Sequence, residues 1–220
     1  MATEPSDPGR ELRDQVKVWS QSGSAREFEE ETLTLSPTDM LSAEHDLIRR
    51  VVRVLEKQVT RIEGGEPVDP VFMDRIVDFL FTYGVRVHHG KEEEILFRAL
   101  DGKDLSPEHR QMMEQLVREH VEIRSITDDL VEAKDAYVAG DQESLSPIQE
   151  ALGDLVGRYP DHLTTEEDVF FPAAESYIDD SEQRAILEDM NRHDQAMIHD
   201  RYGTLADHLE GIVETWALSE

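Results

Sequence analysis

The 220-residue sequence has no cysteine and few basic residues. Without thiols the chain cannot form disulfides, zinc ribbons, thiolate nucleophiles or iron–sulfur clusters, so any metal must be held by His, Asp, Glu or Tyr. Lysine and arginine together number 22 against 50 aspartates and glutamates, which gives a formal net charge of −28. Because this charge repels phosphate backbones and anionic membrane surfaces, we expect neither a nucleic acid nor a membrane as partner.

Long apolar runs are also missing. No segment approaches the stretch of about 20 apolar residues that a transmembrane helix needs. The N-terminal MATEPSDPGR is polar and lacks the charged and apolar regions of a signal peptide. We therefore expect a cytoplasmic protein.

Apolar residues recur at helical spacing after residue 36, and no segment alternates as a half-buried strand would. Pro and Gly positions divide the pattern into five helices that begin near residues 37, 70, 107, 147 and 181. The sequence thus predicts an all-α fold, with an up-down antiparallel four-helix bundle over residues 37–180. Residues 181–220 would form an additional C-terminal helix packed on the bundle. Residues 1–36, rich in Ser, Glu, Asp and Pro, would be a flexible acidic leader.

An internal repeat relates the two halves of the predicted bundle. A lone His45 is followed 44 residues later by His89-x-x-x-Glu93, and a lone His120 is followed 42 residues later by His162-x-x-x-Glu166. Two such hairpins can close into a bundle with pseudo-two-fold symmetry, which would bring equivalent residues together near its axis.

This arrangement predicts a metal site. Histidine and glutamate four residues apart share one face of a helix, so each half would offer two imidazoles and one carboxylate to the core. Ionised carboxylates are costly to bury unless they are paired or bind metal, and two divalent cations bridged by both carboxylates would remove that cost. The donor set suits iron, manganese or zinc. The helical wheel leaves the register open, because His88 and Glu92 have the same spacing as His89 and Glu93.

Three motifs resemble the hemerythrin-like family with its HHE cation-binding domain. They are Glu-His-x-x-Ile-Arg at residues 44–49, His-His-Gly-Lys-Glu-Glu-Glu-Ile-Leu-Phe at 88–97, and Asp-His-x-x-x-Glu-Glu-Asp-Val-Phe-Phe-Pro at 161–172. The resemblance implies a four-helix bundle around a non-haem di-iron centre, bridged by carboxylates and an oxo or hydroxo group. Matched by motif, the metal ligands would be His45, His89, Glu93, His120, His162 and Glu166, with the two glutamates bridging.

The resemblance also implies a function. Family members bind dioxygen, sense oxygen or iron, or handle nitric oxide and peroxide, so it implies a di-iron protein that binds or reacts with these small oxidants. The alternative is an oxygen or iron sensor, or an iron-handling protein without turnover, that reports to a protein partner through its leader and fifth helix.

One departure concerns the number of imidazoles. Oxygen carriers of the family have a second histidine four residues from the lone one on the third helix, where this chain has Leu116 and Arg124 around His120. Four histidines would leave both metals with open positions, which argues against simple oxygen carriage. Tyr159 and His193 are the candidates for an additional ligand. The alternative, which we favour for His193, is that each only packs in the fold, with His193 bonded to a backbone carbonyl or a glutamate, and that water or a hydroxo group holds the open position.

Overall fold

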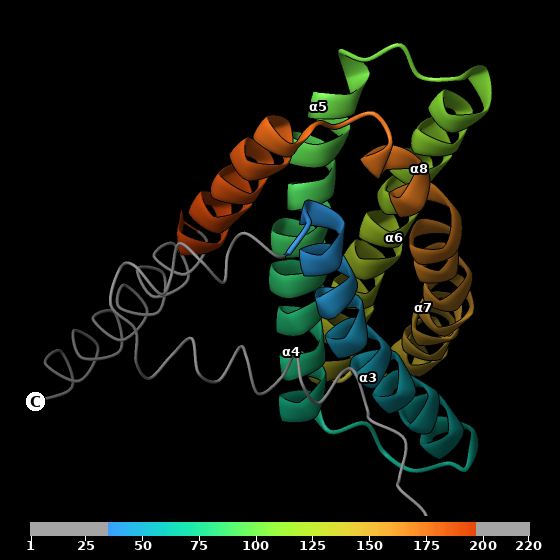
Figure 1. Ribbon diagram of the computed structural model, residues 1–220. Coiled ribbons are helices and arrows are strands. Elements are labelled where there is room, and N and C mark those ends of the chain that lie inside the picture. Colours follow the sequence, from blue (N-terminus) through green and yellow to red (C-terminus); the bar gives the residue numbers. More distant parts are fainter. Residues whose placement is uncertain (1–34, 197–220) are drawn as a thin grey trace, which may run out of the picture.

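The computed structural model describes residues 35–196 as helices joined by short turns, with no strand in that range (Figure 1). Four long helical segments pack antiparallel into a bundle, and residues 180–196 form a fifth helix outside it. The predicted all-α class is confirmed. The leader predicted for residues 1–36 falls outside the described residues except for its last two, and so does the fifth helix beyond residue 196.

The four segments of the bundle follow the predicted order along the chain. The first is α3 (Pro37–Glu63). The second is built from α4 (Pro70–Asp78), the π-helical η1 (Phe79–His89) and η2 (Glu92–Phe97), and α5 (Arg98–Asp101). The third is α6 (Pro107–Val138), and the fourth comprises the 3-10 turn η3 (Gln142–Ser144), α7 (Leu145–Thr165), the π-helical η4 (Glu166–Phe170) and α8 (Phe171–Glu175).

Local sequence signals fix where these helices begin and end. Ser36 caps α3 by accepting a hydrogen bond from the Asp39 backbone, and the Asp39 side chain accepts one from the Ser36 backbone in return. Proline follows the capping residue at the start of α3, α4 and α6. Gly65 and Gly140 have φ angles of 79° and 104°, which suit glycine at the turns after α3 and α6.

The core consists of two apolar clusters with a band of histidines and glutamates between them. Along α3, Leu41 belongs to one cluster, Ile48 to the other, and His45 lies between them. His120 occupies the same place along α6. The polar band therefore sits in mid-bundle with apolar packing on both sides, which excludes water from it.

Three π-helical segments, η1, η2 and η4, carry most of this band. A π-helix closes its hydrogen bonds over five residues instead of four, so it places side chains on its faces at different intervals from an α-helix. Adjacent residues such as His88 and His89 can therefore both be buried, and both are. A helical wheel drawn for an α-helix cannot describe this segment.

The fifth helix packs beside the second segment of the bundle (Figure 1). Ile186 and Met190 are buried in the same apolar cluster as Leu41. Among the described residues, no helix is long and apolar enough to cross a membrane.

Candidate metal centre

Seven side chains with no more than 3% exposure gather in mid-bundle. They are five histidines and two glutamates, and all seven fall into two groups whose donor atoms lie close enough to hold a metal ion, with Glu92 and Glu166 in one group. The full set is His45, His88, His89, His120, His162, Glu92 and Glu166.

The first imidazole pair joins the first and second helices of the bundle. The Nε2 atoms of His45 and His88 lie 3.0 Å apart. Their Nδ1 atoms face outward to carboxylates, at 2.9 Å from Glu167 for His45 and at 3.0 Å from Glu44 for His88. Because ionised carboxylates only accept hydrogen bonds, each Nδ1 carries a proton, and Nε2 of each ring faces the centre.

The second pair repeats this arrangement in the other half of the chain. The Nε2 atoms of His120 and His162 lie 3.1 Å apart. Nδ1 of His120 is 2.9 Å from Glu93, and Nδ1 of His162 is 2.8 Å from Glu119. The pseudo-two-fold symmetry predicted from the repeat therefore extends to the carboxylates that orient the rings.

Two arginines complete the outer contacts in the same symmetrical way. Arg49 lies 2.6 Å from Glu167, and Arg124 lies 2.7 Å from Glu93. Burial raises the pKa of Glu167, but His45 and Arg49 outweigh it and hold the pKa at about 2. Glu167 thus stays ionised and keeps the His45 ring in one orientation.

Glu92 and Glu166 each span the two imidazole pairs. One oxygen of Glu92 is 3.6 Å from Nε2 of His88, and the other is 3.3 Å from Nε2 of His120. Glu166 directs one oxygen to within 3.3 Å of His45 and the other to within 3.4 Å of His162. None of these four carboxylate oxygens has a hydrogen-bond partner of normal geometry.

His89 breaks the symmetry of the centre. Its ring stacks on His120 at 3.9 Å between centroids, and both of its nitrogens are buried without a partner. The equivalent position in the second half, directly after His162, is Leu163. Burial lowers the pKa of His89 well below its usual value, and the neighbouring imidazoles lower it further, so the ring is neutral and free to bind a cation.

In the metal-free chain, protons on histidines offset the negative charge of the buried carboxylates. Burial lowers the pKa of His45, but the carboxylates of Glu166 and Glu167 outweigh it and raise the pKa to about 9. The pKa of His120 is likewise raised well above its usual value by Glu166 and Glu92, against the effect of burial. Divalent cations would replace these protons as the counter-charge.

The structure brings together five of the six predicted ligands and places the sixth, Glu93, outside the two groups. Glu93 lies outside the centre, where it contacts His120 and Arg124, and the fully buried Glu92 takes its place. Pairing Glu93 with Glu166 would match Leu96 with Val169, but Leu96 is buried whereas Val169 is 47% exposed. A gapless alignment of residues 92–97 with 166–171 pairs Glu92 with Glu166 and Leu96 with the buried Phe170, and would have given the observed register.

The centre also holds five histidines where four were predicted. His88 pairs with His45, while His89 joins His120 and His162. The fifth imidazole comes from the second helix of the bundle and not from α6. The π-helical geometry of η1 is what allows both neighbours to enter.

His193, one of the two candidates for an additional ligand, belongs to neither group. Nε2 of His193 donates a hydrogen bond to the Arg86 carbonyl at 2.9 Å. Tyr159 is 1% exposed, and its hydroxyl has no hydrogen-bond partner. The hydroxyl oxygen lies 3.1 Å from the position that a Cβ atom on Gly84 would occupy. Burial raises the pKa of Tyr159, and the charges of Glu166 and Glu92 raise it further, so the hydroxyl keeps its proton.

Comparison with known proteins agrees with this geometry. The family model of the hemerythrin HHE cation binding domain matches residues 36–174, and a second, overlapping match covers residues 114–218. Comparison with curated proteins gave no match, and comparison with solved structures gave none. The first match spans both halves of the bundle and well over half of the 220 residues. On this match and the buried histidine–glutamate centre, the chain belongs to the family of the hemerythrin HHE cation binding domain.

Proposed function

We propose that this chain is a non-haem di-iron protein that binds or reacts with small oxidants such as dioxygen, nitric oxide or peroxide. The carrying observation is that Glu92 and Glu166 each direct one oxygen at each imidazole pair while lacking any hydrogen-bond partner. Two ionised carboxylates at this depth are costly without a counter-charge. Two cations bridged by both carboxylates would supply it.

The imidazole spacing fits a cation in each pair. Two nitrogens bound to one metal at right angles, with bonds of about 2.1 Å, lie about 3.0 Å apart. The observed separations are 3.0 Å for His45 and His88 and 3.1 Å for His120 and His162. With protons fixed on the outer Nδ1 atoms, all four rings would present Nε2 lone pairs once cations replace the additional protons on His45 and His120.

His89 would make the two metal positions unequal. It lies with His120 and His162, so one metal would have three imidazoles and the other only His45 and His88. The position with fewer protein ligands would have room for a small exogenous ligand. This restores the asymmetry that a four-histidine site would lack, and it favours binding of one small molecule at the His45 and His88 side.

The surroundings of the centre suit such a ligand. Iron would supply redox chemistry toward dioxygen, nitric oxide or peroxide. The apolar clusters on both sides exclude water, and Tyr159 holds a proton on an unpartnered hydroxyl within the electrostatic reach of both carboxylates. That hydroxyl would donate a hydrogen bond to a small ligand bound at the metals.

Metal analysis combined with an optical spectrum tests this proposal. We expect about two iron ions per chain after anaerobic loading with Fe(II), and a near-ultraviolet band of a bridged di-ferric centre after exposure to air. A stoichiometry well below one, or a spectrum without that band, would contradict a di-iron centre. Peroxide consumption by the loaded protein would separate turnover from the alternative, a sensor or iron-handling protein.

A further inference from the structure

Lys91 is fully buried although it lies next to the candidate ligands. Its side chain has 0% exposure, and its ammonium group contacts Glu44 on α3 and Asp194 on the fifth helix, the latter at 2.8 Å. Burying an ammonium group is costly unless carboxylates pair with it. The chain therefore specifies two acidic partners for Lys91, one inside the bundle and one outside it.

Glu44 connects this lysine to the metal centre. One Glu44 oxygen accepts from Nδ1 of His88 at 3.0 Å, and the other contacts Lys91. A continuous series of polar contacts thus runs from His88 through Glu44 and Lys91 to Asp194. Its far end lies on a helix that is not part of the four-helix bundle.

The other half of the chain has no counterpart to this series. Glu119, which orients His162 as Glu44 orients His88, is contacted by Gln115 of its own helix at 2.8 Å. The position equivalent to Lys91, directly before Glu166, is Thr165. Within residues 35–196, only the proposed metal position of His45 and His88 is therefore linked to the fifth helix by this series.

Docking of the fifth helix holds Asp194 in a defined place. Met190 is fully buried against the bundle, and His193 donates to the Arg86 carbonyl. The His193 ring lies 3.0 Å from the position that a Cβ atom on Gly90 would occupy. The absence of a side chain at Gly90 therefore leaves room for this ring.

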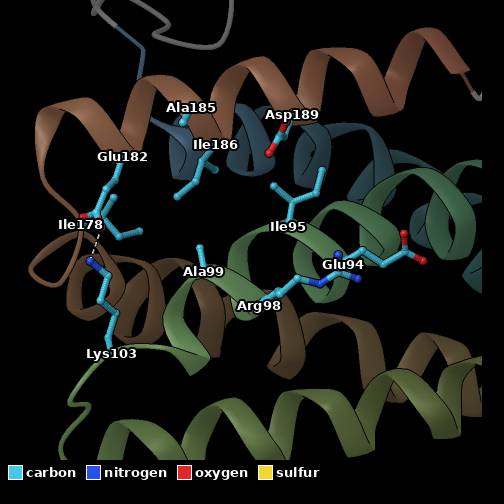
Figure 2. A pocket seen from close by; sticks show the side chains of 10 residues that line it. All are labelled: Glu94, Ile95, Arg98, Ala99, Lys103, Ile178, Glu182, Ala185, Ile186 and Asp189. Atoms are coloured by element: carbon cyan, nitrogen blue, oxygen red, sulfur yellow. Dashed lines mark hydrogen bonds and ion pairs between the residues drawn. The ribbon is translucent and has the colours of Figure 1, made fainter.

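Farther toward the start of the fifth helix, a groove of about 350 Å³ separates it from the second segment of the bundle (Figure 2). Figure 2 shows Ile186 and Ala185 facing Ile95 and Ala99 across this groove, with Lys103 paired to Glu182 at its end. The fifth helix thus packs closely against the second segment of the bundle near Lys91 and less completely along this groove.

We propose that Lys91 and Asp194 are positioning residues that couple the fifth helix to the metal position of His45 and His88. Lys91 fixes Glu44, Glu44 fixes the His88 ring, and Asp194 makes this arrangement depend on docking of the fifth helix. The inference rests on the proposed pair of metals. By thermodynamic reciprocity, binding at this position stabilises the docked helix as much as the docked helix stabilises binding.

Metal titration of full-length variants tests the coupling. The variants are Lys91→Met, which keeps the length of the side chain, and Asp194→Asn, which keeps its shape. The control is Lys134→Met, because Lys134 also links two aspartates, Asp74 at 2.7 Å and Asp135 at 2.8 Å, far from the centre along the chain. Each protein is titrated anaerobically with Fe(II) against a competing chelator, which resolves the affinities of the first and second ion.

We expect one of the two affinities to fall about 10- to 100-fold in Lys91→Met and less in Asp194→Asn, because partners that orient a ligand typically contribute that much. Lys134→Met should leave both affinities unchanged. Hydrogen exchange in residues 180–196 should slow when iron binds to the unmodified chain, and this slowing should be lost in Asp194→Asn. Asp194→Asn keeps the test decisive if Lys91→Met does not fold.

Two outcomes would overturn the inference. One is unchanged iron affinities in Asp194→Asn and Lys91→Met while the unmodified chain binds two ions. The other is an equal loss at both positions, which would show that Lys91 only supports the fold. If the unmodified chain itself fails to bind two ions, the proposed function is at fault instead.

Discussion

Four of the five imidazoles of the centre use their two nitrogens in different ways. The outer Nδ1 donates to a carboxylate and fixes the ring, and the inner Nε2 faces the centre. The adjacent glutamates Glu92 and Glu93 divide their tasks in the same way, since one is buried without a partner and the other orients His120. Glu92 is therefore a candidate ligand, whereas Glu93, its neighbour in the chain, only orients a candidate ligand.

This division predicts different results for two neighbouring substitutions. Glu92→Gln should leave fewer than two metals bound, because a neutral amide cannot bridge two cations as a carboxylate does. Glu93→Gln should retain both metals with an affinity reduced about 10-fold, as expected for a partner that only orients a ligand. Metal content after desalting measures both. Greater loss in Glu93→Gln than in Glu92→Gln would return the register to the one first predicted.

Tyr159 allows a second test at this scale. Its hydroxyl is buried without a partner, so Tyr159→Phe removes an unsatisfied polar group and should not lower the free energy of unfolding. Metal content should stay the same. Azide, as a small anionic probe of the loaded centre, should bind about 5-fold more weakly, because one neutral hydrogen bond contributes about 1 kcal/mol. Unchanged azide affinity would show that the hydroxyl does not reach the ligand.

At the level of the helices, η1 and η2 determine which residues reach the centre. Because their turns are wider than those of an α-helix, His88 and His89 are both buried and belong to different groups of candidate ligands. Gly84, one turn before His88, leaves the space that the Tyr159 hydroxyl occupies. Glycine is required there by close packing, whereas the glycines of α7 have no such neighbour.

Three glycine substitutions test whether close packing needs a glycine at position 84 but not in α7. Gly153 and Gly157 lie in α7 with open space where a side chain would begin, so Gly153→Ala and Gly157→Ala should each raise the free energy of unfolding by about 0.5 to 1 kcal/mol. Gly84→Ala should give no such gain, because its methyl group would lie 3.1 Å from the Tyr159 hydroxyl. Urea unfolding of the chelator-treated proteins measures all three. An equal gain in Gly84→Ala would mean that the Tyr159 ring moves aside at no cost.

The whole molecule buries a charged cluster between two apolar halves, so its stability should depend on what neutralises that cluster. In the metal-free chain this is done by protons on His45, whose pKa is about 9, and on His120. A histidine whose pKa is raised on folding stabilises the fold fully below its unfolded pKa of about 6.5, and this contribution is lost as the pH rises through the folded pKa. Metal ions remove the need for these protons.

We therefore expect the metal-free protein to lose stability between pH 7 and pH 9.5, by a few kcal/mol at most. The iron-loaded protein should melt at a higher temperature than the metal-free one and keep its midpoint over the same pH range, because bound metal stabilises the folded state. Thermal melts with and without chelator at both pH values test this. A metal-free protein that gains stability on going to pH 9.5 would contradict the assigned protonation.

The sequence by itself determined the helical class, the helix boundaries and the repeat, because caps, prolines and apolar periodicity act over a few residues. Ser36-Pro37 starts α3 in the structure where the sequence placed it, and His45, His120, His162 and Glu166 lie in the centre. The positions of residues 88–93 were decided only by the tertiary structure. Their π-helical turns depend on what packs around them, and the burial of Lys91 depends on Asp194, more than 100 residues away in the chain. Local periodicity cannot encode either, because both arise from contacts between helices that are remote in sequence.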